Sequence, residues 1–575
     1  MEIGHAAKRI PEDRLSKLDY ALLGHVLSFL PSKQAARAAV LSSRWRDAFA
    51  GVHTVSLEEP EGSVPTYDDD RRRHCHEDGR PKDHNFPSRF GATITAAIVA
   101  RHRSPAATPP LRALRLALHD YMYRDSAAVD QWISYALKQA GPELELDLRL
   151  RCLPIYCRRA YDIEIDVEPR GDYAAEVTSA CFAAASIITT PEDDDTDDDD
   201  VVSSEHERVP GPSQLLYRES FHLYTAPRGL FSCSALRTLR IGPCRLSPPS
   251  AISLPSLEEL LLTRVPDGEE EVRRLICACP RLADLTLESC DTVTALYLLD
   301  EPRLHRLALR CCHNLARVVV DVSKLIAFEY RGAVPGVAFL TTFGTDGWFL
   351  TMPSLASCIV DICSGEVSAP EELSRLAAFL HHFASAKHLC LRSKRLCPGF
   401  DRDGGAAARL LMFTKLHHLE LWGHLPNDGD ASAIIGATSR ILQHAPNLEV
   451  LSFVFLTGTT NDVDDSGPLP PERYQCEEGE LLDAHRLRYN RYNVLDAPTG
   501  GVMIPCLANQ VREINLVHYQ GGRAQRTLVK FLLCNALAIG ELWCQFAEGP
   551  LFMQTQLTRE MKGWVMNHKT NTVFR

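Results

Sequence analysis

The 575-residue chain is predicted to be an α/β protein, in which a short all-helical module precedes a long solenoid of repeats and a C-terminal capping region. Three observations predict this fold class. Apolar residues follow a helical period near the N-terminus, a pattern L-x-x-L-x-L returns many times after residue 110, and amphipathic helical segments separate several of its copies. A strand plus a helix roughly every 20 to 30 residues cannot bury its apolar side alone, so neighbouring units must stack.

The N-terminal module is predicted from two apolar stripes on one helix. The first stripe, at spacings of three and four, is Leu15, Leu18, Leu22, Val26 and Phe29, and the second is Leu23, Leu27 and Leu30. Pro31 ends this helix, a second helical run follows from Ser32 to Leu41, and Trp45 and Phe49 would share a face of a third short helix. One stripe can pack inward while the other binds a partner, which indicates a docking module.

The same residues resemble the F-box of plant F-box/leucine-rich-repeat proteins. The match runs through Leu15-Ser16-Lys17-Leu18, Leu22-Leu23-Gly24-His25-Val26-Leu27-Ser28-Phe29-Leu30-Pro31 and Val40-Leu41-Ser42-Ser43-Arg44-Trp45-Arg46. The resemblance implies binding to the adaptor Skp1 and, through it, to a cullin and a RING subunit of a ubiquitin ligase. The adaptor-facing residues that it implies are Leu18, Leu22, Leu23, Val26, Leu27, Leu30, Pro31, Val40, Leu41 and Trp45.

The sequence departs from the F-box pattern in three places. Asp19 follows Leu18 directly where the family usually has Leu-Pro-Asp, and Phe49 stands where Trp is common. Gly24 lies mid-helix, where glycine costs about 1 kcal/mol relative to alanine. The other interpretation of the segment is an ordinary helical hairpin packed on its own domain.

The repeat is defined by the positions of its leucines. Clear copies begin at Leu236, Leu257, Leu282, Leu304, Leu416 and Leu448, with others at Leu111 and Val511 and weaker ones at Leu315, Leu325 and Leu355. From residue 236 to residue 325 the steps are 21, 25, 22 and 21 residues, which is the period of leucine-rich repeats. Cys290 and Cys312 occupy the consensus position for Asn or Cys, where the chain turns off the strand. The alternative is a leucine-rich α/β domain without a true repeat.

Several segments between and after these copies have one apolar face and are predicted to be helices. They are Val129–Ala140, Val272–Cys279, Leu373–Phe383, Ile434–Ala445, Gln525–Leu537 and Leu557–Val565. With a strand over Val511–Leu516, the last two helices loosely resemble the C-terminal FBD region of plant F-box proteins, and they can cover the final apolar edge of the repeats.

The domain organisation follows from these segments and from the runs that interrupt them. We expect a flexible N-terminus (1–11), an F-box (12–55), a linker or loop region (56–104), repeats (105–456), a loop insert (457–500) and an FBD-like cap (501–575). Within the repeats, residues 190–212 are expected to form a disordered acidic insert, because eight of the nine residues from Glu192 to Asp200 are acidic and repel one another.

Composition excludes several classes of function. A net charge of −12 argues against a nucleic-acid ligand, because that affinity depends on Lys and Arg that neutralise phosphates. No apolar run approaches membrane-spanning length and no signal peptide is visible, so we expect an intracellular protein, in the nucleus and/or the cytoplasm, without a membrane partner. The 19 cysteines lie in apolar runs and are interpreted as reduced core residues.

No catalytic or cofactor motif is present. The chain lacks a phosphate-binding G-x-x-x-x-G-K-[ST] loop, G-x-S-x-G, H-E-x-x-H and any C-x-x-C. His74-Cys75-His76 is interpreted as part of a solvated loop, because a structural zinc site needs four ligands, usually in two spaced pairs. We therefore expect no cofactor, no metal and no enzymatic activity.

The repeats are expected to bind a target protein on the concave face of the solenoid. Residues between and just after the inward leucines point outward from the sheet. They give the candidate target-binding residues Arg240, Glu259, Asp284, Glu288, Arg306, Arg310, His418, Glu420 and Trp422, where Trp422 is either an aromatic anchor or a packing residue.

Three hypotheses of function remain. The first is the substrate-recognition subunit of an SCF (Skp1–cullin–F-box) ubiquitin ligase, which would contribute proximity and orientation only. The second is a non-degradative F-box scaffold, and the third is an enzyme with an unrecognised site. The target itself cannot be named from the sequence.

Overall fold

A computed structural model describes most of the chain outside its longer insertions. The described residues are 18–38, 42–59, 89–101, 109–119, 121, 125–150, 223–299, 303–344, 347–349, 351–363, 367, 369–397, 412–425, 431–456, 504–547, 549 and 551–575. The predicted N-terminal segment 1–11, the His74-Cys75-His76 cluster, the acidic insert 190–212 and the loop insert 457–500 lie outside them, and those predictions stay open. No helix among the described residues is both long and apolar enough to cross a membrane.

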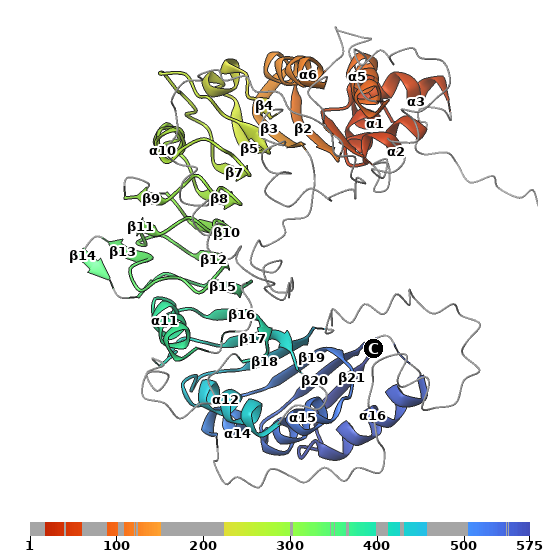
Figure 1. Cartoon of the computed structure of the whole chain (residues 1–575). Coiled ribbons are helices and arrows are strands. Elements are labelled where there is room, and N and C mark those ends of the chain that lie inside the picture. The colour runs from red at the N-terminus through yellow and green to blue at the C-terminus, as the bar shows by residue number, and fades with distance from the viewer. Residues whose placement is uncertain are drawn as a thin grey trace, which may run out of the picture. The chain divides into compact units, whose positions relative to one another are not determined.

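One parallel sheet of fifteen strands runs through the described residues, with its strands in chain order (Figure 1). The first seven are β1 (Thr54–Glu58), β2 (Leu111–Leu118), β3 (Ala140–Leu150), β5 (Leu236–Gly242), β7 (Glu259–Thr263), β8 (Asp284–Glu288) and β10 (Arg306–Arg310). The others are β12 (Ala327–Gly332), β15 (Ser357–Ile362), β16 (His388–Arg395), β17 (His418–His424), β18 (Val450–Phe455), β19 (Glu513–Tyr519), β20 (Glu541–Phe546) and β21 (Asn571–Phe574). The predicted α/β fold class is confirmed.

The register of the sheet follows from the spacing of the leucines. Leu239, Leu260 and Leu285 pair directly on β5, β7 and β8, and all three are fully buried. Successive residues of a strand point to opposite faces, so the residues between the leucines form the other face. We call that second face, opposite the buried leucines, the open face of the sheet.

The leucine-bearing face is covered mainly by helices (Figure 1). They are α5 (Arg89–Arg101), α6 (Ser126–Lys138), α10 (Glu269–Cys277), α11 (Pro370–His381), α12 (Ala431–Gln443), α14 (Pro505–Asn509), α15 (Arg523–Asn535) and α16 (Leu551–Trp564). Six of them, α6, α10, α11, α12, α15 and α16, coincide with the six predicted helices to within a few residues. The prediction held there because each segment has an apolar face at the helical period.

Between α10 and α11 a second sheet replaces the helices. It contains β9 (Ala295–Leu298), β11 (Arg317–Asp321), β13 (Leu340–Gly344) and β14 (Gly347–Phe349). The weak copy predicted at Leu315 belongs to this sheet, so its assignment as a repeat of the main sheet was wrong. Leu315 leads into β11, whose Val318 and Val320 are buried against the core, and the apolar alternation alone did not distinguish the two sheets.

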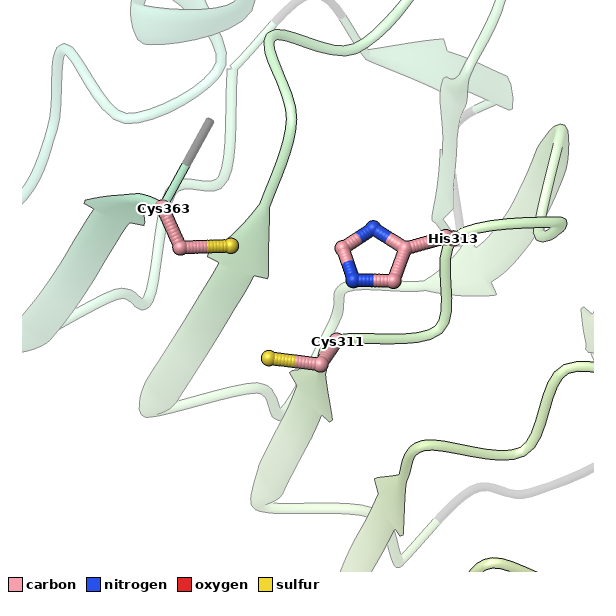
Figure 2. Close-up of side chains that lie close together, drawn as sticks. All are labelled: Cys311, His313 and Cys363. Carbon is pink, nitrogen blue, oxygen red and sulfur yellow. The ribbon is translucent and has the colours of Figure 1, made fainter. Parts of the chain in front are cut away.

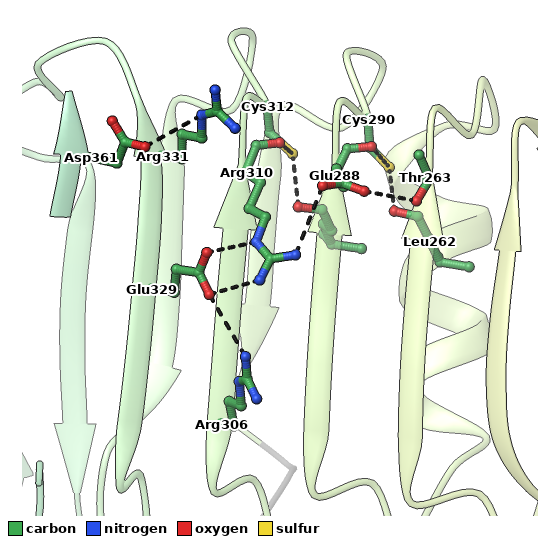
Figure 3. Close-up of polar contacts among 11 residues, drawn as sticks. Leu262, Thr263, Glu288, Cys290, Arg306, Arg310, Cys312, Glu329, Arg331 and Asp361 are labelled. Atoms are coloured by element: carbon green, nitrogen blue, oxygen red, sulfur yellow. Dashed lines mark hydrogen bonds and ion pairs between the residues drawn. The ribbon is translucent and has the colours of Figure 1, made fainter. Parts of the chain in front are cut away.

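The cysteines at the consensus turn position connect successive repeats. The Cys290 thiol donates to the Leu262 carbonyl oxygen at 3.5 Å, and the Cys312 thiol donates to the Leu287 carbonyl oxygen at 3.5 Å. Both side chains thus satisfy a backbone carbonyl of the preceding repeat, as Figure 3 shows for the two turns. These cysteines have the structural role that their place in the repeat predicts.

The N-terminal module contains α1 (Tyr20–Leu27), α2 (Ser32–Ala38), α3 (Ser43–Ala48) and the 3₁₀ turn η2 (Phe49–Gly51). Asp19 caps α1, because its carboxylate accepts a hydrogen bond from the Leu22 amide at 2.7 Å. Asp19 therefore still begins the helix, although it follows Leu18 directly and no proline precedes it. Trp45 and Phe49, predicted to share a face of one short helix, both pack in the same small core, although Phe49 lies in η2 directly after α3.

Part of the predicted linker 56–104 is ordered secondary structure, which corrects its interpretation as a loop. β1 pairs with β2 at the edge of the main sheet, and α5 follows. Arg101 at the end of α5 is fully buried and donates to the Val52 carbonyl at 2.6 Å and to the Tyr135 hydroxyl at 2.6 Å. This contact joins the N-terminal module to α6, and no sequence motif predicted it.

The C-terminal segment extends the main sheet and ends with α16 and β21. Arg526 of α15, 3% exposed, makes a two-point ion pair with Glu560 of α16 at 2.9 and 2.8 Å. Met553, Leu557 and Met561 of α16 are buried. The C-terminal segment thus packs as expected of a closing element. The boundaries of all the expected domains stay predictions.

Candidate functional site

Helix α1 and the turn directly after it present apolar side chains to solvent. Leu22 is 49% exposed, Val26 41%, Phe29 73% and Leu30 37%. These four residues form what we call the α1 apolar surface. Exposed aliphatic and aromatic side chains gathered at one place are typical of a protein-binding site.

Two residues of the predicted adaptor-facing set belong instead to the core, which is a correction. Leu23 and Leu27 are each 1% exposed and pack with Ala35, Ala48 and Phe49. Because they lie on the inward side of α1, they can support a binding surface but cannot touch a partner. The sequence separated Leu22, Val26 and Phe29 from Leu23 and Leu27, but it placed the exposed Leu30 in the second stripe and did not say which stripe faced solvent.

The other members of the predicted set lie around α1. Leu18 is half-buried, and its carbonyl oxygen accepts a hydrogen bond from Arg44. Pro31 is exposed, and Trp45 is half-buried against the small core. Val40 and Leu41 lie outside the described residues. Phe29, which the predicted set omitted, is the most exposed residue of the α1 apolar surface, and its place in the first stripe was the available signal.

Gly24 is required by close packing, which reverses its interpretation as a weak point of the helix. A Cβ atom at Gly24 would lie 2.6 Å from both the carbonyl carbon and the oxygen of Gly51 in η2. Real Cβ atoms essentially never approach that closely. The glycine therefore lets α1 lie directly against the following turn, and that contact outweighs the propensity cost.

The predicted target-binding residues of the first repeats lie on the open face but are paired with one another (Figure 3). Arg310 donates to Glu329 at 2.6 and 2.8 Å and lies 3.8 Å from Glu288. Arg306 lies 3.8 Å from Asp284 and 3.7 Å from Glu329. Burial would raise the pKa of Glu329, but its hydrogen bonds from Arg310 hold that pKa below the usual value. These charges are therefore largely neutralised within the sheet.

The same pairing continues on the preceding strands. Arg240 of β5 donates to Glu259 of β7 at 2.8 Å and lies 3.9 Å from Asp147 of β3. Burial raises the pKa of Asp147 despite its arginine neighbours. Glu329 and Asp147 were absent from the predicted set, although each occupies an outward position of its strand.

A hollow of about 560 Å³ opens on the same face over β17 to β20. Its charged and aromatic lining includes His418, Glu420, Trp422, Glu513, Glu541 and Trp543. The structure thus brings three predicted residues, His418, Glu420 and Trp422, together with three that were missed. The signal for Glu513 was its outward place in Val511-x-x-Ile514-x-Leu516, and Trp543 lies in a similar stretch, Ile539-x-x-Leu542-x-Cys544.

The side chains of the hollow are positioned by contacts within a strand and between neighbouring strands. The Trp422 indole N–H donates to Glu420, and the Arg392 guanidinium lies 4.0 Å from the Trp422 ring centroid. The Asn515 amide donates to Glu513 at 2.7 Å. Trp422 is therefore both packed and partly exposed, so the two interpretations of it are compatible.

Two histidines stack beside the hollow. The rings of His388 and His418 are 4.4 Å apart at their centroids with 22° between their planes, and His418 also lies 3.1 Å from the Ser452 hydroxyl. Burial, and then the charge of His388, lower the pKa of His418, while Glu420 and Glu513 act in the opposite direction. The lowered pKa favours the neutral form of the His418 imidazole.

Two groups of metal-ligand side chains converge among the described residues. They are His388, His418 and Glu420 beside the hollow, and Cys311, His313 and Cys363 at the ends of β10 and β15. The sequence predicted neither group, because each combines two residues of one repeat with a third from a different repeat.

Comparison with known proteins identifies the class to which this arrangement corresponds. Residues 15–54 match the F-box domain family, and residues 214–331 match the family described as FBD-associated F-box protein At5g56370, LRR repeats. The chain therefore carries an F-box followed by leucine-rich repeats. F-box domains generally bind Skp1-like adaptors, and proteins with this combination are typically non-catalytic adaptors of SCF type.

Individual relatives come from Arabidopsis thaliana. F-box/LRR-repeat protein At3g59200 is 28% identical over 145 residues, which are 25% of this chain and 24% of the relative. FBD-associated F-box protein At5g18780 is 48% identical over 52 residues, 9% of this chain and 12% of the relative. F-box/LRR-repeat protein At3g60040 is 22% identical over 364 residues, 61% of each. The predicted resemblance to plant F-box/leucine-rich-repeat proteins is confirmed.

Proposed function

We propose that this chain is the substrate-recognition subunit of an SCF-type ubiquitin ligase. It would bind a Skp1-like adaptor, and through it a cullin and a RING subunit, by its N-terminal module and a target protein by its repeats. The observation that carries the proposal is the α1 apolar surface, which lies inside the segment that matches the F-box domain. The chain would supply no catalytic group of its own and would act by proximity and orientation inside the cell, in the nucleus and/or cytoplasm.

The adaptor side of the proposal rests on a rigid support under the exposed residues. Leu23 and Leu27 anchor the inward side of α1, Asp19 caps its beginning, and Gly24 lies against Gly51. The outward residues are therefore held in place before binding. Preorganisation of this kind lowers the entropy lost on association.

The target side is proposed to be the hollow over β17 to β20. Glu420, Glu513 and Glu541 contribute carboxylates, and aromatic surface comes from Trp543 and from the part of Trp422 that Arg392 does not cover. This combination suits a basic segment of a protein, because carboxylates pair with Lys or Arg and aromatic faces attract cations. We therefore propose a target that presents Lys or Arg to the hollow.

The arginines of the first repeats are weaker candidates for target capture. Arg306 and Arg310 already contact Glu329 within the sheet. Replacing both by Glu would place like charges beside Glu329, Glu288 and Asp284. Such a variant would disturb the sheet itself, so the hollow offers a cleaner test.

Adaptor binding is tested with the double variant Leu22→Asp and Val26→Asp. Both residues are exposed, so the fold should persist, while two carboxylates would have to be buried against the adaptor. We expect the affinity for a purified Skp1-like adaptor, measured by calorimetry, to fall by more than about tenfold.

The matched control is Val337→Asp, at an aliphatic residue that is 74% exposed and lies outside the N-terminal module. Its affinity for the adaptor should equal that of the unmodified chain. Undiminished binding by the Leu22→Asp and Val26→Asp variant would contradict the assignment of the adaptor surface.

Target capture is tested by proximity labelling with a Trp422→Ala and Trp543→Ala variant. We expect a set of proteins to be lost from the labelled pool while adaptor binding stays unchanged, because the two faces are separate. If the chain acts in a ubiquitin ligase, ubiquitylation of those proteins should require both the α1 apolar surface and the hollow. If the proteins are captured but never ubiquitylated, the non-degradative scaffold is the better description.

A further inference from the structure

We propose that Cys311, His313 and Cys363 form a binding site for Zn²⁺. The two thiols and one imidazole are brought to one place at the carboxyl ends of β10 and β15, with all three donor atoms within 4.8 Å of one another. Figure 2 shows the Cys363 sulfur pointing toward the imidazole of His313, and the Cys311 sulfur pointing toward Cys363. Thiolate and imidazole are the donors that zinc prefers in proteins.

The backbone holds both cysteines firmly. The Cys311 amide donates to the Arg331 carbonyl at 2.6 Å, and the Cys363 amide donates to the Gly332 carbonyl at 3.0 Å. The two cysteines therefore bind successive carbonyls of β12, one from each side. Residue 332 between them has no side chain, and a Cβ there would lie 2.6 Å from the Tyr330 hydroxyl. The hydrogen bonds at these two strand ends thus fix the backbone positions of Cys311 and Cys363.

His313 lies in the turn between β10 and β11. The Leu315 amide donates to the Cys312 carbonyl at 3.1 Å, and the Asn314 side chain donates to the Asp291 carbonyl at 2.8 Å. These bonds fix the turn that carries His313. A site whose ligands come from anchored segments needs little reorganisation when it binds an ion.

The backbone of the turn does not itself require a cysteine at position 311. Cys311 has a φ of +52°, and Arg264 and Ser289 adopt φ values of +50° and +52° directly after β7 and β8. Other residues therefore serve at this position of the turn. Cys290 and Cys312, in contrast, have the carbonyl-binding role described above. The cysteine at 311 is thus available for a different role.

The distances fit a site that closes on its ion. Around a tetrahedral Zn²⁺ with bonds of about 2.3 Å to sulfur and 2.0 Å to nitrogen, the ligand atoms lie about 3.5 to 3.8 Å apart. Rotations that move the donor atoms by roughly 1 Å would close the observed group around the ion. Cys311 is 2% exposed, while His313 and Cys363 are half-buried. Three protein ligands leave the fourth position to water or to an incoming donor.

The test uses the full-length chain, purified under reducing conditions and freed of metal with a chelator. Co²⁺ is the first probe, because thiolate ligands give it a sulfur-to-metal charge-transfer absorption that nitrogen and oxygen ligands do not. We expect one equivalent of Co²⁺ with that absorption, and its displacement by one equivalent of Zn²⁺. Zinc should also slow the reaction of two thiols with a thiol reagent.

The variant is His313→Gln with Cys363→Ser, two half-buried positions that tolerate substitution better than Cys311. It should lose the charge-transfer absorption and bind zinc at least a hundredfold more weakly, with an unchanged circular dichroism spectrum. The control Cys277→Ser, at the exposed end of α10, should bind as the unmodified chain does. The absorption of the unmodified chain is informative even if the variant fails to fold.

Three results on the unmodified chain would overturn the proposal. They are the absence of stoichiometric binding, binding without the charge-transfer absorption, which would point to His388, His418 and Glu420 instead, and a disulfide between Cys311 and Cys363 that persists after purification under reducing conditions. Retention of zinc by the double variant would exclude this group as well.

Discussion

At the scale of the residue, the fold decides which of two similar side chains is available to a partner. Leu22 and Leu23 are adjacent leucines on one helix, yet one is 49% exposed and the other 1%. Charged side chains likewise differ in whether they are already paired within the fold. Arg310 has two acidic neighbours across the strands, whereas the acids of the hollow have no Lys or Arg among the residues that line it. A candidate site is therefore defined by what each side chain already contacts.

His418 offers a prediction about pH. Its folded-state pKa lies below the ordinary 6.5 because of burial and then because of His388. The folded chain therefore binds fewer protons than the unfolded chain just below pH 6.5. The stability contributed by neutral His418 is present above pH 6.5 and is lost as the pH falls toward the lowered value. Thermal unfolding measured between pH 7.5 and 5 should show the decline.

Replacing His388 by Gln removes the second cause of the shift. The pKa of His418 should then rise toward 6.5, as measured by NMR titration of its ring proton in histidine-labelled chain. His417→Gln is the matched control, because His417 is exposed and contacts the Lys415 carbonyl instead. An unchanged pKa in the His388→Gln variant would show that the stacked pair does not interact electrostatically.

At the scale of the element, close contacts between backbones govern how the helices are placed. Helix α1 lies against η2 through Gly24 and Gly51 with no side chain between them. Helix α5 is joined to α6 and to the N-terminal module by the buried Arg101. Contacts of this kind depend on three-dimensional proximity, so helix propensity alone misjudges the residues that make them.

Gly24→Ala tests the contact between α1 and η2. Alanine normally stabilises a helix relative to glycine, but here its Cβ would meet the Gly51 carbonyl group at 2.6 Å. We expect a loss of about 1 to 3 kcal/mol, typical of overpacking, in the opening free energy of the α1 amides measured by hydrogen exchange.

Gly436→Ala in α12 is the control, because nothing lies within 4 Å of a Cβ at that position. The α12 amides should gain up to about 1 kcal/mol of protection. If both variants gained protection, the proposed role of Gly24 in packing would be wrong.

At the scale of the whole molecule, the described repeats share one sheet and one apolar core. The core cluster runs from Val55 to Met561, and stacked repeats are stabilised mainly by their neighbours. The C-terminal elements are therefore expected to stabilise the repeats before them as well as themselves. Helix α16 covers part of the core next to α15 and supplies Glu560 to the buried Arg526.

Deletion of residues 551–575 tests this dependence. The deletion uncovers apolar residues and removes the acidic partner of Arg526, which alone is expected to cost about 3 to 5 kcal/mol. We expect a lower soluble yield and a lower melting temperature for the main unfolding transition. Deletion of residues 571–575 alone removes β21 but keeps α16, so its effect should be clearly smaller. Equal melting temperatures for the full chain and the longer deletion would contradict the capping role.

The sequence by itself determined the class of the protein and most of its elements. Leucine spacing placed the strands β5, β7, β8 and β10, apolar faces placed six helices, and the residues from Leu15 to Arg46 carried the resemblance to the F-box. These patterns are readable because burial on one side of a strand or helix forces a fixed period on the chain.

The tertiary structure alone decided what contacts what. It placed Leu23 and Leu27 inside, joined Arg310 to Glu329, gathered His418 and Trp543 around one hollow, and brought Cys311 to Cys363. Such pairs come from different elements, and their distance in space depends on register and packing between elements, which no local pattern contains.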